Sequence, residues 1–236
     1  TKITLDKIIS DFEKQGINVL SANTYNNDGS NYTKPYHIKE FKTNEGTIKV
    51  GILGLTIKEV GHPTMWDGEK LVKTKSLELK DQKGYEGQLY MNDLVEDAKK
   101  WVKIIKEKEK ADLIVAVAHT GEKAKKPKNP GNRIQDLAQN VSGIDVIVAG
   151  HNHVQIKQHD YKNIDGDTVI VTEPGKHGEC ISKINIKLKK ENNKWNVVDK
   201  SSDIVKFENS NNNLNMLSEN DGKFYVETSS LLEKGK

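Results

Sequence analysis

Residues 144–153 read Ile144-Asp145-Val146-Ile147-Val148-Ala149-Gly150-His151-Asn152-His153, an apolar run followed by a glycine and two histidines that lie one residue apart. A short apolar run that ends in glycine is typical of a buried strand, and glycine permits a sharp turn after it. Such a turn presents neutral imidazole nitrogens from a rigid sheet edge, as a metal site requires. We therefore predict a strand over 144–149 and a metal-binding turn over 150–153.

A second apolar run, Leu113–Ala118, ends in the same way, in His119-Thr120-Gly121. Each run follows an amphipathic segment, 94–105 or 134–141, whose apolar residues recur at helical spacing. Helices that alternate with continuously apolar strands predict an α/β fold with a sheet covered on both faces. Because such sheets place ligands at the carboxyl ends of their strands, we expect the His119 and His151 imidazoles within about 10 Å of each other. The alternative is that surface loops carry these histidines by chance.

The remaining pattern predicts one more helix, further strands and a long surface excursion. Leu5, Ile8, Ile9 and Phe12 share a helix face before Gly16, which is a usual stop signal. Strands are expected over 17–22, 36–41, 47–54, 168–172, 181–188 and 195–198, with hairpins joining the second to the third and the fifth to the sixth. Residues 55–90 show no sustained period and predict an excursion that shapes a binding site. His159 is expected in a polar loop.

Composition excludes several classes of protein. Lys and Arg number 37 against 34 for Asp and Glu in the 236 residues, and this net charge of +3 is too even to indicate a nucleic-acid-binding module. No apolar stretch approaches the roughly 18 residues that a membrane span needs. With one cysteine, Cys180, the chain can form neither an intrachain disulfide nor a multi-cysteine metal site. No segment of the 236 residues is expected to be a signal peptide.

The three strand-end histidines can serve one metal ion or two. Two-metal sites hold their ions about 3.5–4 Å apart and clamp the attacking and leaving oxygens of a displacement at phosphorus. Two dications so close need an anionic bridge, for which a carboxylate is the obvious group. Asp112 and Asp145 precede their strands and so lie at the wrong end. Three histidines are therefore half of such a site.

Several segments resemble the calcineurin-like metallophosphoesterases. Ala118-His119-Thr120-Gly121 is similar to their His-Ser/Thr-Gly element, and Gly150–His153 is similar to their Gly-His-x-His element. Other segments resemble one branch of this family, which contains bacterial 5′-nucleotidases and 2′,3′-cyclic-nucleotide 2′-phosphodiesterases. These segments are 19–23, 49–56, 143–145 and 173–178. The similarity covers most of residues 1 to 205.

The resemblance implies part of a four-layer α/β/β/α sandwich and a metal-dependent phosphoesterase that acts on nucleotides. Residues 1–205 would be the C-terminal half of the catalytic domain, and 206–236 a linker or helical tail. His119 and His151 would bind one divalent ion and His153 the other, the ions being zinc, manganese or similar. The family's Asp-x-His, bridging Asp and Asn-His-Glu elements have no match here, so the chain is expected to be an incomplete catalytic domain, inactive alone.

No catalytic or substrate-binding residue is assigned. His177 lies in a glycine-flanked turn and is interpreted first as a turn residue and second as a contact to substrate phosphate. Thr120 and Asn152 are expected to orient the imidazoles through hydrogen bonds. The alternatives to the enzyme are a non-catalytic module that keeps the fold without turnover and a single-metal hydrolase. The resemblance further implies nucleotide catabolism and a secreted, cell-wall or periplasmic location.

Overall fold

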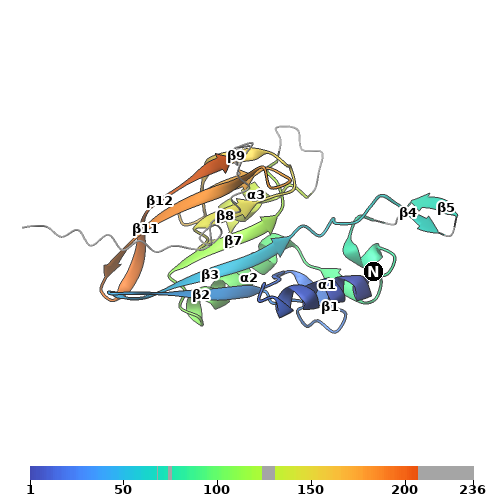
Figure 1. The fold of residues 1–236 in the computed structure, drawn as a ribbon, viewed down its shortest axis with the longest axis horizontal. Coiled ribbons are helices and arrows are strands. Elements are labelled where there is room, and N and C mark those ends of the chain that lie inside the picture. Colours follow the sequence, from blue (N-terminus) through green and yellow to red (C-terminus); the bar gives the residue numbers. More distant parts are fainter. Residues whose placement is uncertain (68, 74–75, 124–130, 207–236) are drawn as a thin grey trace, which may run out of the picture.

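The computed structural model describes residues 1–67, 69–73, 76–123 and 131–206 (Figure 1). The expected tail after residue 206 lies outside the described residues. The centre is a six-stranded sheet in the order β2-β3-β7-β8-β10-β9. Strands β3 (Gly46–Thr56), β7 (Leu113–His119), β8 (Val146–Ala149) and β10 (Thr168–Pro174) run parallel, and the edge strands β2 (Tyr36–Thr43) and β9 (Gln155–Lys162) run antiparallel to their neighbours. The predicted α/β class is confirmed.

Two helices cover one face of this sheet. The side chain of Asp93 caps α2 (Leu94–Glu107) by accepting hydrogen bonds from the amides of Val95 and Glu96, and α3 (Ile134–Asn140) lies beside it. Their apolar residues meet alternate residues of the strands, so Val102, Ile105 and Leu137 share one core cluster with Ile114 and Ile147. The expected helices over 94–105 and 134–141 are confirmed.

A long hairpin covers the opposite face. It consists of β11 (Cys180–Glu191) and β12 (Lys194–Lys206), which cross the sheet in Figure 1. Ile184, Ile186 and Trp195 of the hairpin pack on Val115 and Val146, which point away from the helices. The described residues thus form a helix layer, a sheet layer and a hairpin layer, and a four-layer sandwich stays a prediction.

The elements of residues 1–91 that do not belong to the central sheet lie at one end of it (Figure 1). Helix α1 (Lys2–Lys14) has no buried residue, and it is followed by Gly16 at a φ of 77°. A small sheet pairs β1 (Thr24–Asn26) with β6 (Leu89–Met91). The excursion contains a short 3-10 helix, Leu79–Asp81, and the hairpin of β4 (Thr64–Asp67) and β5 (Lys70–Lys73), which projects from the body in Figure 1.

Two sequence-based expectations are wrong. The segment 17–22 forms only an isolated bridge between Leu20 and Lys34, because its amides bond to two separate segments: Ser21 N donates to Lys34 O and Ala22 N to Gly54 O. His159 lies in β9, not in a polar loop. That strand lies at the sheet edge and exposes most of its side chains, so it lacks the apolar run that marks a buried strand.

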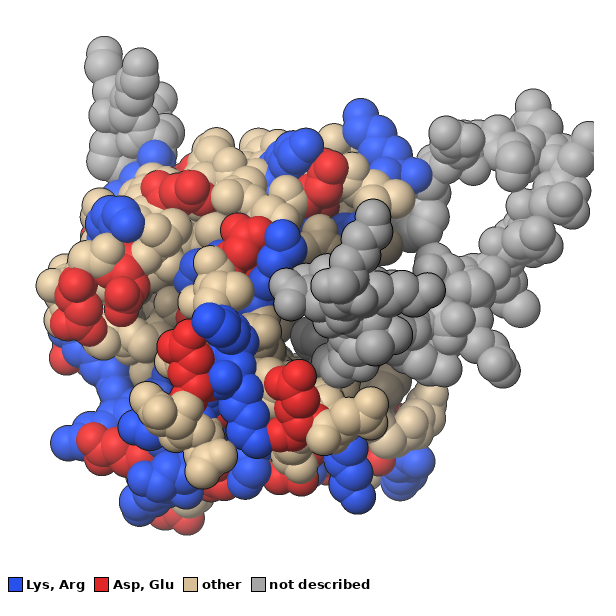
Figure 2. All heavy atoms as spheres, turned by 90° about the vertical axis from the view of Figure 1, so that its left-hand side faces the viewer, with Lys and Arg blue, Asp and Glu red and all other residues tan. Residues whose placement is uncertain are grey.

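The surface mixes charges of both signs. On the face shown in Figure 2, Lys and Arg side chains lie beside Asp and Glu, and neither sign gathers into a large patch. No helix among the described residues is long and apolar enough to cross a membrane.

Candidate metal centre

The carboxyl ends of β7 and β8 bring His119 and His151 together. Ala118 pairs with Ala149 in the parallel register, so the next residues of the two strands leave the sheet side by side. His151 Nδ1 lies 3.4 Å from His119 Nε2, and the ring centroids are 5.2 Å apart. The expectation that these imidazoles lie within about 10 Å of each other is confirmed.

His153 follows His151 by two residues in the same turn. Its ring lies near that of His177, with centroids 6.4 Å apart and the ring planes tilted by 50°. A charge on His153 is close enough to lower the pKa of both His119 and His151. His177, at a φ of 56°, occupies the turn after β10 and borders this group of rings.

The electrostatics favour neutral imidazoles. Burial is the largest cause that lowers the pKa of His119, followed by charge on His151 and then on His153. Burial and then charge on His153 lower the pKa of His151. A neutral imidazole keeps one nitrogen lone pair free for a metal.

The donor set fits a divalent transition metal at His119 and His151. Two nitrogens bound at about 2.0–2.1 Å to one tetrahedral ion lie about 3.3 Å apart, close to the 3.4 Å between these two ring nitrogens. Among the described residues, however, no group of three or more His, Cys, Asp or Glu side chains is gathered tightly enough to hold an ion. The histidines therefore fit as part of a ligand set.

The turn that carries His151 and His153 has an uncommon backbone. His151 has a φ of 99° and His153 a φ of 58°. Residues other than glycine held there cost about 1–3 kcal/mol each and persist only where their surroundings enforce the conformation. The turn must therefore be held by contacts outside itself.

One such contact joins the two histidine loops through Asn152 and Gly121. Asn152 Nδ2 donates to the carbonyl of Glu122 at 2.9 Å. A Cβ at Gly121 would lie 2.3 Å from the Asn152 carboxamide, so only glycine leaves room for this side chain. The predicted contact of Asn152 with an imidazole is replaced by one with the backbone of the opposite loop.

Glu122, which follows the His119 loop, is held by β9. Its carboxylate accepts from Tyr161 Oη at 2.6 Å and lies 3.0 Å from His159 Nδ1. Burial, and then the hydrogen bond to Glu122, raises the pKa of Tyr161. Sequence reasoning missed this contact because it missed β9.

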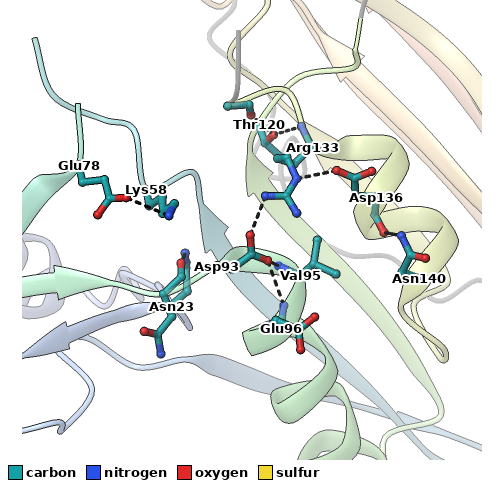
Figure 3. A network of polar contacts seen from close by, with 12 residues as sticks. Asn23, Lys58, Glu78, Asp93, Val95, Glu96, Thr120, Arg133, Asp136 and Asn140 are labelled. Atoms are coloured by element: carbon teal, nitrogen blue, oxygen red, sulfur yellow. Dashed lines mark hydrogen bonds and ion pairs between the residues drawn. The ribbon is translucent and has the colours of Figure 1, made fainter. Parts of the chain in front are cut away.

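Thr120 ties the His119 loop to the helix layer (Figure 3). Its hydroxyl accepts from the amide of Arg133 at 2.8 Å and donates to the carbonyl of Gly131. The Arg133 guanidinium then bonds to Asp93 and Asp136, at 2.6 Å each, and so joins the N-terminus of α2 to α3. Thr120, like Asn152, positions a loop and not an imidazole.

Glu173 is the other polar group beside the histidine turn that sequence reasoning did not select. It lies in β10 with 0% of its surface exposed. Burial raises its pKa, although the amides of Val154, His153 and Asn152 act in the opposite direction. The signal in the sequence was a glutamate at the end of the apolar run Val169-Ile170-Val171-Thr172.

Comparison with known proteins supports the resemblance. The family model described as "Bacterial capsule synthesis protein PGA_cap" matches residues 4–171. The trifunctional nucleotide phosphoesterase protein YfkN of Bacillus subtilis is 31% identical over 79% of this chain and 12% of its own length. A 2′,3′-cyclic-nucleotide 2′-phosphodiesterase/3′-nucleotidase of Salmonella typhimurium is 26% identical over 69% of this chain and 24% of its own length. The chain thus spans about a quarter or less of these relatives.

Solved structures agree with the sequence comparison. The crystal structure of the calcineurin-like phosphoesterase YfkN from Bacillus subtilis aligns with a TM-score of 0.63 at 28% identity, over 80% of this chain and 56% of that one. A 5′-nucleotidase precursor from Thermus thermophilus shares the fold, with a TM-score of 0.60 at 19% identity over 84% of this chain and 35% of that one. The chain is thus a member of the bacterial capsule synthesis protein PGA_cap family, and its sequence and fold are those of the calcineurin-like phosphoesterases.

Proposed function

We propose that this chain contributes to the divalent-metal site of a phosphoesterase that hydrolyses phosphate esters of nucleotides. His119 and His151 bind one ion, and His153 binds a second. The observation that carries the proposal is the 3.4 Å approach of two imidazole nitrogens at neighbouring strand ends. The substrate class follows from the relatives, which are named as nucleotide phosphoesterases and nucleotidases.

The residues of the chain supply ligands and rigidity. Divalent ions, when bound, lower the pKa of a bound water and polarise phosphoryl oxygens. His119 and His151 are suited to hold such an ion because burial lowers their pKa values and so favours the neutral imidazole. The contacts of Asn152 and Glu122 fix the two loops relative to each other, so that little reorganisation is needed when a ligand binds.

We further propose that residues 1–205 are the second half of a catalytic domain and turn over little alone. Two neighbouring dications repel each other strongly unless an anion bridges them. Asp112 and Asp145 do not serve, because they bond to backbone amides at the amino ends of the strands: Asp112 Oδ2 accepts from Lys49 N, and Asp145 Oδ2 from Ile114 N. The bridging carboxylate would come from a region that this chain does not contain.

A non-catalytic module is the second candidate. It is favoured by the lack, among the described residues, of a group of three metal-binding side chains around one point. Such a module would keep the sheet and a weak affinity for metal but would hydrolyse nothing, even when joined to further sequence.

The test compares the 236-residue chain with a longer chain extended upstream in its gene. Both are assayed on 5′-AMP, 3′-AMP and 2′,3′-cyclic AMP with Mn²⁺ or Zn²⁺, with and without a chelator. We expect chelator-sensitive hydrolysis by the longer chain and little or none by the shorter one. Robust turnover by the shorter chain would contradict the incomplete-domain proposal, and inactivity of both would favour the module.

We propose a location outside the cytoplasm, in line with the word "precursor" in the description of the Thermus thermophilus structure. Cell fractionation with an antibody to the chain tests this, and recovery solely in the cytoplasmic fraction would contradict it.

A further inference from the structure

Glu173 is a fully buried carboxyl group that lies against the backbone of the histidine turn. Val154 N donates to its Oε1 at 3.4 Å, and the amides of His153 and Asn152 are close enough to act on the pKa of the carboxyl group. Its other oxygen, Oε2, is buried without a hydrogen-bond partner among the described residues. Three consecutive amides of one turn therefore lie next to one buried acidic side chain, and that of Val154 donates to it.

The backbone of the turn explains this arrangement. His151 and His153 have positive φ angles of 99° and 58°, and Asn152 between them does not. When left-handed and ordinary residues alternate, successive N–H groups point to the same side and form a concavity that binds anions. In this chain the occupant of the concavity is a side chain of the neighbouring strand β10.

We propose that Glu173 is a positioning residue, whose carboxyl group fills the concavity behind residues 152–154 and holds His151 and His153 in their metal-binding orientation. The inference deepens the proposed function, and it rests on that function only for the identity of the ligand that the histidines bind. The strained conformation of the turn persists because its amides have this acceptor in a place that water does not reach.

The first experiment measures how well the amides of the turn 151–154 are protected from hydrogen exchange in the absence of metal. Amide hydrogen exchange is followed by NMR in the 236-residue chain and in three variants, Glu173→Ala, Glu173→Gln and Thr172→Val. Thr172 is the matched control, because it is equally buried in β10 but donates to Ile156 O instead of the turn. In Glu173→Ala the amides of residues 152–154 should exchange about tenfold faster or more, while those of β8 keep their protection.

In Glu173→Gln, the exchange rates of the amides of residues 152–154 should lie between those in Glu173→Ala and those in Thr172→Val. Its carboxamide oxygen still accepts from an amide, but its NH₂ group cannot, so partial protection is expected. Thr172→Val should leave the exchange of 152–154 unchanged even if it lowers overall stability. If Glu173→Ala fails to fold, Glu173→Gln decides. Wild-type exchange rates at 152–154 in every folded Glu173 variant would overturn the proposal.

The second experiment measures Zn²⁺ affinity by calorimetry in the same proteins. Loss of a group that orients metal ligands costs about 10–100-fold in affinity, so Glu173→Ala should bind Zn²⁺ that much more weakly and Thr172→Val as well as wild type. An unchanged affinity in Glu173→Ala would overturn the role in metal binding. If neither the wild-type chain nor the chain extended upstream binds Zn²⁺, the proposed function fails, and the exchange experiment still decides what Glu173 does.

Discussion

His151 is the side chain on which the metal proposal depends most directly. It supplies a nitrogen to the closest imidazole pair and stands on a strained turn. Replacing it by alanine should weaken Zn²⁺ binding by about 100-fold or more, since loss of a mere supporting contact already costs about 10–100-fold. Zn²⁺ titration of the purified variant measures this.

His37 is the matched control for His151. It lies in β2 and pairs across the sheet with Ile52, far along the strand order from β8. His37→Ala should leave Zn²⁺ affinity unchanged. His159 does not serve as a control, because its contact with Glu122 connects it to the His119 loop. Full metal content in the His151 variant would remove the turn 150–153 from the site.

The two histidine loops should behave as one unit because Asn152 packs against Gly121. Gly121→Ala alone places a methyl group 2.3 Å from the carboxamide and should cost about 1–3 kcal/mol of unfolding free energy by overpacking. In an Asn152→Ala background the obstructing atoms are gone, so the same substitution should cost much less. Urea denaturation of the two single variants and the double variant measures the coupling. Additive free energies would show that the loops are independent.

Arg133 joins the helix layer to the His119 loop, and its contribution should depend on pH. Burial alone would raise the pKa of Asp93 and of Asp136. The Arg133 guanidinium nevertheless holds the pKa of Asp93 low, and Lys123 and Arg133 together hold that of Asp136 low. Groups whose pKa falls on folding stabilise the protein above their unfolded pKa of about 3.9, and this contribution is lost as the pH drops through the folded values.

Arg133→Ala should therefore lower the unfolding free energy at pH 7, by about 1 kcal/mol for such a partly exposed network. The difference from wild type should shrink below about pH 4, as both carboxyl groups become protonated. Thermal unfolding followed across this pH range is the measurement. Lys99→Ala, which breaks an exposed pair with Glu96, is the control and should show almost no effect. A pH-independent loss in the Arg133 variant would mean that packing, not charge, is what the residue provides.

Elements whose apolar residues recur at a regular spacing were predictable from the sequence. Elements whose position depends on contacts with distant segments were not. The apolar runs of α2, β7 and β8 can be recognised in the sequence, because a buried face needs apolar residues at a fixed spacing. The meeting of His119 and His151 followed from parallel strands that end at one edge. Glu173, Glu122 and β9 could not be found in this way, since their places depend on contacts between segments distant in sequence.

For the whole molecule, bound metal should act as a stabiliser. A ligand that binds only the folded state at a free concentration 100 times its dissociation constant adds about 2.7 kcal/mol to the unfolding free energy. The melting temperature of the chain should therefore rise with Zn²⁺ and fall back on addition of a chelator. The rise should vanish in His151→Ala but persist in His37→Ala. A melting temperature that ignores Zn²⁺ would argue against a site built from these histidines.

The polar character of β9 has a consequence for how the protein behaves in a crowded solution. An edge strand with bare amides and carbonyls invites another chain to pair with it, and charged side chains along the edge discourage such pairing. On β9, Lys157, His159 and Asp160 face the solvent, and Ser202 of β12 already occupies the carbonyl of Lys157. The exposed polar side chains that make β9 hard to recognise in the sequence thus also discourage another chain from pairing with this edge of the sheet and starting an aggregate.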